Sequence, residues 1–472
     1  MNRHIIFVTL PLCSIINFSY AGGFQMHEQN ASIGDVHANH SVNTKDASVN
    51  FYNPAGLTDI LESTVTNSAV TVANKISFKG YSVVKTDPEP DPRFYPPISG
   101  SGKSSTDGLH VIPALHYATP INDKFAFGLS VASPFAAELD WPNKNFTRYN
   151  STLNGIKTIN FTPSIAYKIN NQLSLGFGPE IQYVDMQINK IVGTSYDYTF
   201  DDQDPRIFDS LVTNNLTNTG FGWHAGILWK PANQLKIGYS YRSNITHKAE
   251  GQSKLKGRLA GDHEDPSTDK VNKSKNLKAT IRIPSTMALS MQFSPNHDFE
   301  LVSTVIYTRW NVVKYFNLEN VPAAFSDVDN HTPLYIRLVQ NTLDFKNTFT
   351  VLNGLHWHYN NRLTLKSGFG FDQTPTSNNH RDLKMPDGDR FLFGLGANYD
   401  YSKNINFEFG WMYVNIPTIK INKVAVIPPP AIDNPTMNPG EISEIYGKAR
   451  GYAHIIGLQV TFSPQKVMNY FI

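Results

Sequence analysis

The chain has 472 residues, a formal net charge of +2 and only 40% hydrophobic residues. Lysine and arginine form no basic stripe along the sequence, which argues against a nucleic-acid partner. After the N-terminus, no stretch approaches the roughly 20 apolar residues of a spanning helix, so any membrane crossing must use strands. Because lipid satisfies no backbone polar groups, such strands must close into a barrel.

The first residues predict a secretory signal peptide over residues 1–21. Arg3 supplies the positive start, residues 5–18 supply a broken apolar run, and cleavage is expected after Ala21. The single cysteine, Cys13, lies inside this segment, so the processed chain is expected to carry no disulfide. These features favour a bacterial outer-membrane barrel over a disulfide-stapled secreted domain.

Residues 22–60 do not alternate between apolar and polar side chains. They are rich in Ala, Ser, Asn and His and contain Asn53-Pro54-Ala55-Gly56, which indicates a turn or a helix start. We expect this part of the chain to be a compact non-strand segment placed before the barrel. Its small residues suit a plug packed within a polar lumen.

Residues 61–462 repeat one pattern, in which short alternating segments are separated by turns rich in Asn, Asp and Pro. A strand points successive side chains to opposite faces, so each segment has one apolar face. Six short turns alternate with seven long polar stretches, as in barrels with short periplasmic turns and long external loops. The sequence thus predicts an all-β, 14-stranded antiparallel transmembrane barrel, with a C-terminal extension over 463–472. One clear apolar face consists of Phe391, Phe393, Leu395, Ala397, Tyr399 and Tyr401.

Proline interrupts the third expected strand at Ser133-Pro134-Phe135. Proline removes a ladder donor and is excluded from central strands except at bulges and edges. Since a closed barrel has no edge, a local opening in the wall is one interpretation. An ordinary strand end entering a loop is the other.

Several short motifs resemble, in order and spacing, the FadL family of outer-membrane long-chain fatty acid transporters, which includes channels for aromatic hydrocarbons. The resemblance covers nearly the whole processed chain. The matching motifs are Gly22-Gly23-Phe24-Gln25, Asp46-Ala47, Asn53-Pro54-Ala55, Pro113 with His116, Pro120-Ile121-Asn122-Asp123, Phe221-Gly222-Trp223, Tyr241-Arg242-Ser243, Pro386-Asp387 and Asp389-Arg390-Phe391.

The resemblance implies a fourteen-stranded barrel plugged by an N-terminal hatch. It implies capture of a long-chain fatty acid or similar hydrophobic molecule at the outer face and a shift of the N-terminus. Release then follows sideways at the kinked third strand, at Ser133, Pro134 and Phe135. The plug and N-terminal gate would comprise Gly22, Gly23, Phe24, Asp46, Asn53, Pro54 and Ala55.

A fatty acid also needs a cation for its carboxylate. By strand parity, Lys190 and Lys346 both fall on the inner face near the external ends, where the resemblance implies basic ligand contacts. Arg242 and Arg282 share the inner parity and could replace either. The alternative is that both lysines are solvated lumen residues.

We expect no enzyme, no cofactor and no metal site. A barrel phospholipase needs a Ser, a His and an orienting polar residue on the lipid face, which is instead overwhelmingly apolar. His27, His37 and His40 gather in the hatch without a supporting carboxylate or cysteine pattern, so polar lining is their expected role. A general porin conflicts with the plug. The expected protein is a monomer in outer-membrane lipid, with an aromatic hydrocarbon channel as the alternative function.

Overall fold

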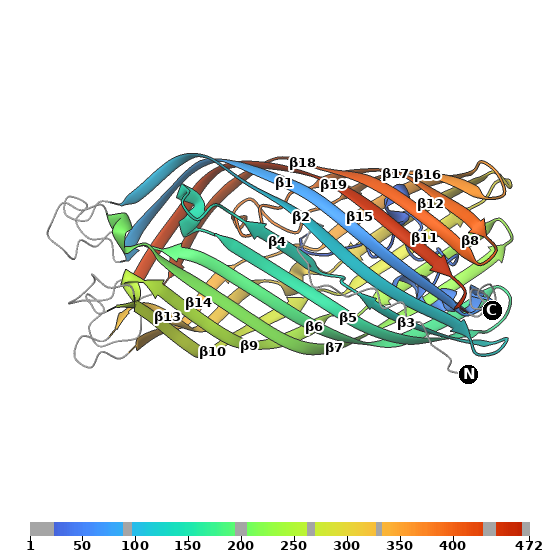
Figure 1. Cartoon of the computed structure of the whole chain (residues 1–472), viewed down its shortest axis with the longest axis horizontal. Helices are drawn as coiled ribbons and strands as arrows, with labels where there is room; N and C mark the ends of the chain where they lie inside the picture. The colour runs from blue at the N-terminus through green and yellow to red at the C-terminus, as the bar shows by residue number, and fades with distance from the viewer. Residues whose placement is uncertain are drawn as a thin grey trace, which may run out of the picture.

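The computed structural model describes residues 23–87, 97–193, 205–261, 270–326, 333–427 and 440–464. Over these residues, nineteen strand segments form one antiparallel sheet that closes as a fourteen-stranded barrel (Figure 1). The first and last segments complete the ring, with Val65 opposite Phe462. The predicted fold class is confirmed. The expected signal peptide and Gly22 lie outside the described residues.

In the described parts of the chain, nine barrel strands run without interruption and five are each divided into two segments. The continuous strands are β1 (Thr64–Asp87), β2 (Ile98–Pro120), β5 (Leu153–Lys168), β6 (Leu173–Val192), β7 (Ser210–Ala232), β16 (Leu363–Asp372), β17 (Arg390–Ser402), β18 (Ile405–Ile427) and β19 (Gly440–Phe462). The divided strands are β3 (Phe125–Ala132) with β4 (Ala136–Asp140), β8 (Leu235–Arg242) with β9 (Ile245–Gly257), β10 (Lys270–Ile283) with β11 (Thr286–Phe293), β12 (Phe299–Thr308) with β13 (Tyr315–Ser326), and β14 (Pro333–Thr342) with β15 (Thr348–His358). The helical turns are η1 (Ser32–Asp35), α1 (Val49–Tyr52), η2 (Pro54–Asp59), η3 (Phe146–Tyr149), η4 (Pro205–Phe208), η5 (Arg258–Ala260) and η6 (Trp310–Val312).

The alternation of side chains follows the predicted parity in the membrane-facing wall. On β6, Leu175 and Phe177 are exposed on the outside, whereas Ser174, Glu180 and Gln182 are buried inside. An apolar outer face and a polar inner face are typical of strands between lipid and a wet or plugged lumen. Among the residues described, no helix is long and apolar enough to cross a membrane.

Several strands are much longer than a membrane requires. Strand β1 has 24 residues and β7 has 23, whereas roughly 9–11 tilted residues span a bilayer. One of the seven long polar stretches expected to be loops covers residues 190–219, and this expectation is wrong in part, because residues 190–192 and 210–219 lie in the paired strands β6 and β7. Their polar outward residues resemble loop residues, but the ladder continues beyond the membrane and lets both faces meet water.

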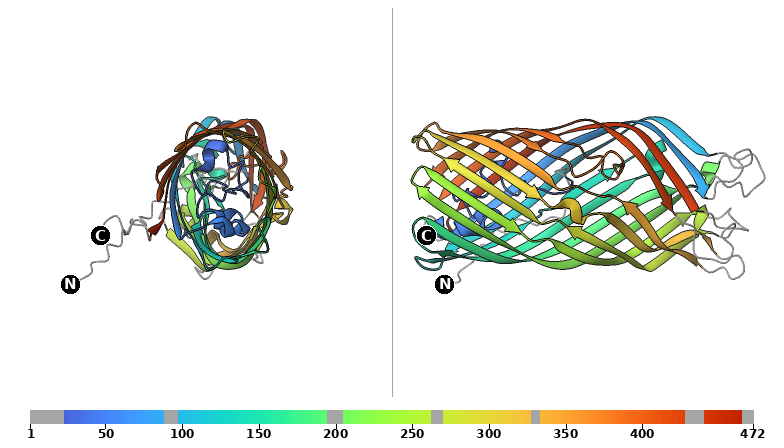
Figure 2. Two further views of the ribbon diagram at one scale, coloured as in Figure 1. Left: turned by 90° about the vertical axis from the view of Figure 1, so that its right-hand side faces the viewer. Right: turned by 180° about the vertical axis from the view of Figure 1, so that it is seen from behind.

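The hatch lies inside the barrel, nearer the end with the short turns (Figures 1 and 2). Glycines in the wall make room for it. A Cβ at Gly226 would collide with the side chain of Asn53, and a Cβ at Gly176 would collide with Ala55. Because only glycine permits this approach, the plug and the wall are matched in shape along this contact.

Candidate functional site

The wall of the barrel is broken at Ser133, Pro134 and Phe135, between β3 and β4. β3 pairs with both β2 and β5. β4 pairs with β5, and within the described ranges it has no ladder with β2. The predicted interruption of the third strand is therefore confirmed as a structural break, and its role in release remains a prediction.

The N-terminal part of the hatch takes the place of the missing ladder. The backbone N–H of Met26 donates to the carbonyl of Pro134 at 2.7 Å, and the N–H of Ala136 donates to the carbonyl of Phe24 at 2.8 Å. Gln25 and Phe135 form the antiparallel bridge between them. Backbone groups freed by the break thus find partners in the hatch rather than in a strand.

Gln29 closes the break from inside. Its Oε1 accepts from the N–H of Ser133 at 2.7 Å, and its Nε2 donates to the carbonyl of the same residue at 2.8 Å. On the other side, the carbonyl of Phe135 accepts from the backbone N–H of Thr158 at 2.8 Å. Gln29 could not be predicted from the sequence, since nothing in its neighbourhood indicates a partner 104 residues away.

The start of the described chain is held by a buried carboxylate. The N–H of Gly23 donates to Oδ2 of Asp387 at 3.0 Å, and Asp387 also pairs with Arg390. Gly23 has a φ of +67°, and a Cβ there would lie 2.7 Å from the ring of Trp310. Glycine is therefore required here both by conformation and by space. Asp387 and Arg390 belong to motifs that were identified in the sequence only through the family resemblance.

Phe24 of the N-terminal segment lies in a cluster with three other aromatic rings, those of Phe135, Trp310 and Phe345. Phe24 contacts Trp310 and Phe135 edge-on, with ring centroids 4.8 and 5.8 Å apart. Trp310 also contacts Phe345 at 5.8 Å. Trp310 and Phe345 come from residues 309–314 and 343–347, where the strand pairs β12/β13 and β14/β15 are divided. The divisions of these two strands thus place two aromatic side chains against the hatch segment that closes the break at residues 133–135.

The space left between hatch and wall beside the break is small. A cavity of about 30 Å³ is lined by residues that include His40, Tyr52, Pro134, His224 and Arg242. Such a volume is close to that of one water molecule. In this conformation, a hydrophobic ligand can reach the break only if the N-terminal segment moves.

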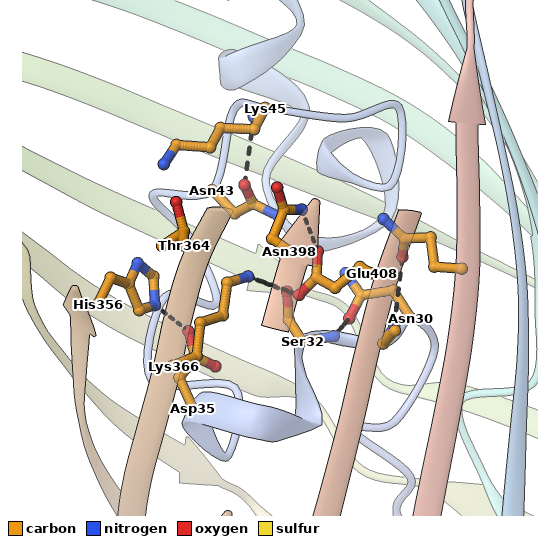
Figure 3. A network of polar contacts seen from close by, with 12 residues as sticks. Asn30, Ser32, Asp35, Asn43, Lys45, His356, Thr364, Lys366, Asn398 and Glu408 are labelled. Carbon is orange, nitrogen blue, oxygen red and sulfur yellow. Dashed lines mark hydrogen bonds and ion pairs between the residues drawn. The ribbon is translucent and has the colours of Figure 1, made fainter. Parts of the chain in front are cut away.

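A polar network fastens the other side of the hatch to the wall (Figure 3). On η1, Ser32 Oγ donates to Oε1 of Glu408 on β18 at 3.0 Å. Lys366 on β16 pairs with the same carboxylate at 2.5 Å. Nearby, Asp35 pairs with His356 on β15 at 2.6 Å. These buried polar and charged side chains hold η1 against three strands, β15, β16 and β18.

The hatch histidines lie in a cluster of aromatic rings. His40 contacts Tyr52 edge-on at 4.9 Å, and His27 lies 6.3 Å from His40. Within the described ranges, no group of three metal-ligating side chains comes together. Burial lowers the pKa of His27 to about 3 and the pKa of His37 to about 4. Because the unfolded histidines titrate near pH 6.5, acid below that pH lowers the free energy of unfolding.

A second network joins strands to the hatch. Glu180 pairs with Arg242, and Arg242 donates to the carbonyl of Phe51 at 2.8 Å and lies over its ring. Oε1 of Glu180 also bonds Nδ1 of His224 at 2.9 Å, and Nε2 of His224 bonds Ser164 at 2.9 Å. The order resembles a hydrolytic triad. However, the same carboxylate oxygen binds Arg242, and every member is buried in the lumen rather than on the lipid face.

The two expected carboxylate ligands differ in their surroundings. Lys190 pairs with Glu441 of β19 at 2.7 Å near the outer end of the lumen. Lys346 is exposed and lies between β14 and β15. The inward position predicted for Lys346 is wrong, because the strand breaks there and Phe345 turns inward instead. The inward position predicted for Arg282 is also wrong, because this residue is exposed between buried Ile281 and Ile283.

The outer end carries a larger hollow that sequence analysis did not predict. Its volume is about 560 Å³, and its lining includes Ile98, Phe146, Arg148, Tyr149 and Arg206. Its lining is polar for the larger part, with the cations Lys144, Arg148 and Arg206 beside the apolar side chains of Ile98 and Phe146. Its size is in the range of small-molecule sites. Its residues are far apart in the sequence, which is why no motif indicates it.

Asn53 gives a direct test of the hatch. Its Oδ1 caps η2 by accepting from Ala55, and its Nδ2 donates to the carbonyls of Ser41 and Ile227. We expect Asn53→Ala to lower the free energy of unfolding by about 1 kcal/mol and to raise small-ion conductance while the barrel still inserts. Planar-bilayer recordings measure this. Asp46→Ala should act similarly, because Oδ1 of Asp46 accepts a hydrogen bond from the backbone N–H of Ser48 at 2.8 Å. Unchanged conductance in both variants would contradict a plug held by these bonds.

These features define a class of protein: a closed outer-membrane barrel whose lumen is plugged by its own N-terminal segment and whose wall is broken where that segment lies. Residues 12–463 match the family described as outer membrane protein transport protein (OMPP1/FadL/TodX). The chain belongs to this family, so it is a bacterial outer-membrane protein of a family that transports hydrophobic molecules. Family members are channels rather than enzymes.

Known relatives are similar over nearly their whole length. Outer membrane protein P1 of Haemophilus influenzae is 24% identical over 471 residues, covering 94% of this chain and 95% of that protein. The long-chain fatty acid transport protein of Escherichia coli K12 is 23% identical, covering 86% and 90%. The crystal structure of a Pseudomonas aeruginosa FadL homologue has a TM-score of 0.75 at 22% identity, covering 93% and 99%. A monoaromatic hydrocarbon channel, CymD, has a TM-score of 0.59 at 12% identity, covering 94% and 99%. The structural likenesses establish the fold.

Proposed function

We propose that this protein takes up long-chain fatty acids or similarly elongated hydrophobic molecules and releases them sideways into the bilayer at residues 133–135. The break in the wall carries this proposal, because it is closed by a short segment of the hatch instead of by a strand. An apolar ligand in water costs about 25 cal/mol per Å² of exposed surface, so release into lipid is favoured over release into the periplasm.

The contacts at the break suit a gate that opens. Between the hatch and the broken strand, the bonds run from Met26, Ala136 and Gln29, and each can be replaced by water when the segment moves. The cavity of about 30 Å³ beside them is too small for a lipid chain. Entry of the ligand therefore requires displacement of residues 23–29, which would uncover the gap between β2 and β4.

Lys190 is our candidate for the carboxylate of a fatty acid. Its ammonium group faces the lumen and is paired with Glu441, whose side chain is 7% exposed. A ligand carboxylate would compete with Glu441 for the same cation. We expect Lys190→Ala to weaken long-chain fatty acid binding roughly tenfold or more, since hydrogen bonds to charged groups contribute about 1.5–3 kcal/mol. Binding of a neutral hydrocarbon of similar length should stay unchanged in the same equilibrium assay.

Glu441→Gln is the matched control, because it frees the ammonium group without removing it. Fatty acid binding by this variant should be tighter than that of the unaltered protein. Lys346→Ala tests the other lysine expected to contact the carboxylate. Its exposed position supports such a contact only while the fatty acid is being captured at the outer face. If Lys190→Ala weakens binding of the fatty acid and of the neutral hydrocarbon equally, the lysine has a packing role and the carboxylate proposal fails.

An aromatic hydrocarbon is the second candidate ligand. The rings of Phe24, Phe135, Trp310 and Phe345 supply a contact surface for a flat apolar molecule at the gate. Such a ligand carries no charge, so the Lys190→Ala variant would transport it normally. The comparison of the two ligands in that one variant separates the candidates.

A further inference from the structure

Four lysines form a row across four adjacent strands on the outside of the barrel. Lys79 on β1 lies directly opposite Lys103 on β2 and directly opposite Lys448 on β19. Lys448 in turn lies opposite Lys420 on β18. All four side chains are exposed. The lysines are scattered through the sequence, and only the closure of the barrel brings them to one level.

The row faces away from the lumen and carries an unbalanced charge. The residues next to three of the lysines, Phe78, Ala449 and Ile421, are buried inside the barrel. Neighbouring strands lie roughly 4.8 Å apart, and like charges directly opposite one another destabilise a sheet. In the part of the chain that the structure describes, none of these four ammonium groups has a carboxylate partner. The row therefore favours an anion supplied from outside the protein.

The outward side chains of β19 show where the row stands relative to the membrane. From the short-turn end they run Leu458, Ile456, His454, Tyr452, and then Arg450 and Lys448. Tyr452 lies beside Tyr413 of β18, with ring centroids 6.5 Å apart. Aromatic side chains of this kind mark the membrane interface in barrels. The row thus lies just beyond the outer interface, on the side of the long loops, at the level of lipid head groups.

We propose that this row binds the phosphate groups of lipopolysaccharide in the outer leaflet. A lysine ammonium is a compact point charge that binds phosphate without a fixed geometry, which suits a mobile head group. Two or more phosphates shared among four lysines and Arg450 would remove the repulsion within the row. The surface is separate from the ligand path, because its side chains point to the outside of β1, β2, β18 and β19.

The test uses the full-length protein, purified in detergent and freed of lipid. The variant changes all four lysines: Lys79→Gln, Lys103→Gln, Lys420→Gln and Lys448→Gln. We expect its affinity for purified lipopolysaccharide to fall on the order of a hundredfold, and binding by the unaltered protein to weaken with added salt. Without lipopolysaccharide, the thermal unfolding midpoint of the variant should equal or exceed that of the unaltered protein, because the repulsion is gone.

Controls distinguish the source of the effect. Lys124→Gln with Lys403→Gln removes charges at the short turns, on the opposite side of the membrane, and should leave binding unchanged. Dephosphorylated lipopolysaccharide should bind weakly to the unaltered protein. If the four-lysine variant does not assemble, the central pair Lys79→Gln with Lys448→Gln is measured instead. Equal binding by the variant, equal binding of the dephosphorylated lipid, or equal stabilisation by inorganic phosphate at the same concentration would each overturn the proposal.

Discussion

Uptake should be lost when the break in the wall is sealed, although the protein still assembles and still binds ligand. Along β3, even-numbered residues face inward and odd-numbered residues face the lipid. Continuing that parity, Ser133→Val places an apolar side chain outside, and Pro134→Thr restores a backbone donor for the ladder. The restored strand would pair with β2 and displace Met26 and Gln29 from the break.

The sealed variant should bind a long-chain fatty acid in detergent with unchanged affinity, whereas cells that carry it should take up no more than cells lacking the protein. Pro163→Val is the matched control. Pro163 stands in β5, opposite Leu129, where the pairing of β5 with β3 is already continuous. Its replacement removes a proline from the same wall without closing the gap between β2 and β4, so uptake should persist. Full uptake by a variant whose structure shows a continuous wall would exclude lateral release and indicate a path through the plug.

Much of the fold could be predicted because strand periodicity is a local property. The alternation around Leu175 and Glu180 assigned each side chain to a face without knowledge of its neighbours. Pro134 likewise predicts a break in the ladder, because proline has no backbone N–H to donate. The sequence indicates loops at the long outer ends of β6 and β7, since polar residues above the membrane no longer alternate with apolar ones.

The site depended on contacts that no local pattern carries. Residues 343–347 break the tenth barrel strand without a proline or glycine, and Asp344 there has a φ of +41°. Uninterrupted alternation along this strand predicts that Lys346 points inward and Phe345 outward. In the structure, Phe345 is buried and Lys346 is exposed. Gln29 was missed because its partner, Ser133, meets it only when the barrel closes around the hatch. Closure, and not local propensity, creates these pairs.

Breaking the buried pair between Lys366 and Glu408 should release the hatch from the wall. The two side chains are 7% and 3% exposed, and Ser32 of the hatch donates to the same carboxylate oxygen that Lys366 binds. Removing one partner of a buried ion pair costs about 3–5 kcal/mol, because the remaining charge is left without a partner in a low dielectric. In Glu408→Ala, water must therefore enter to solvate Lys366.

Water can reach Lys366 most readily if η1 separates from β16 and β18, since the barrel strands are held by continuous ladders whereas η1 is held by side chains. We expect Glu408→Ala to insert and to remain heat-modifiable on denaturing gels, but to show greatly raised small-ion conductance in planar bilayers. The double variant Lys366→Met with Glu408→Met removes both charges and fills the space with apolar groups, an exchange that is often neutral or stabilising. Its conductance should return close to that of the unaltered protein. If the double variant conducts as strongly as Glu408→Ala, the hatch is held by the hydrogen bond from Ser32, and the buried charge has no part in closing the channel.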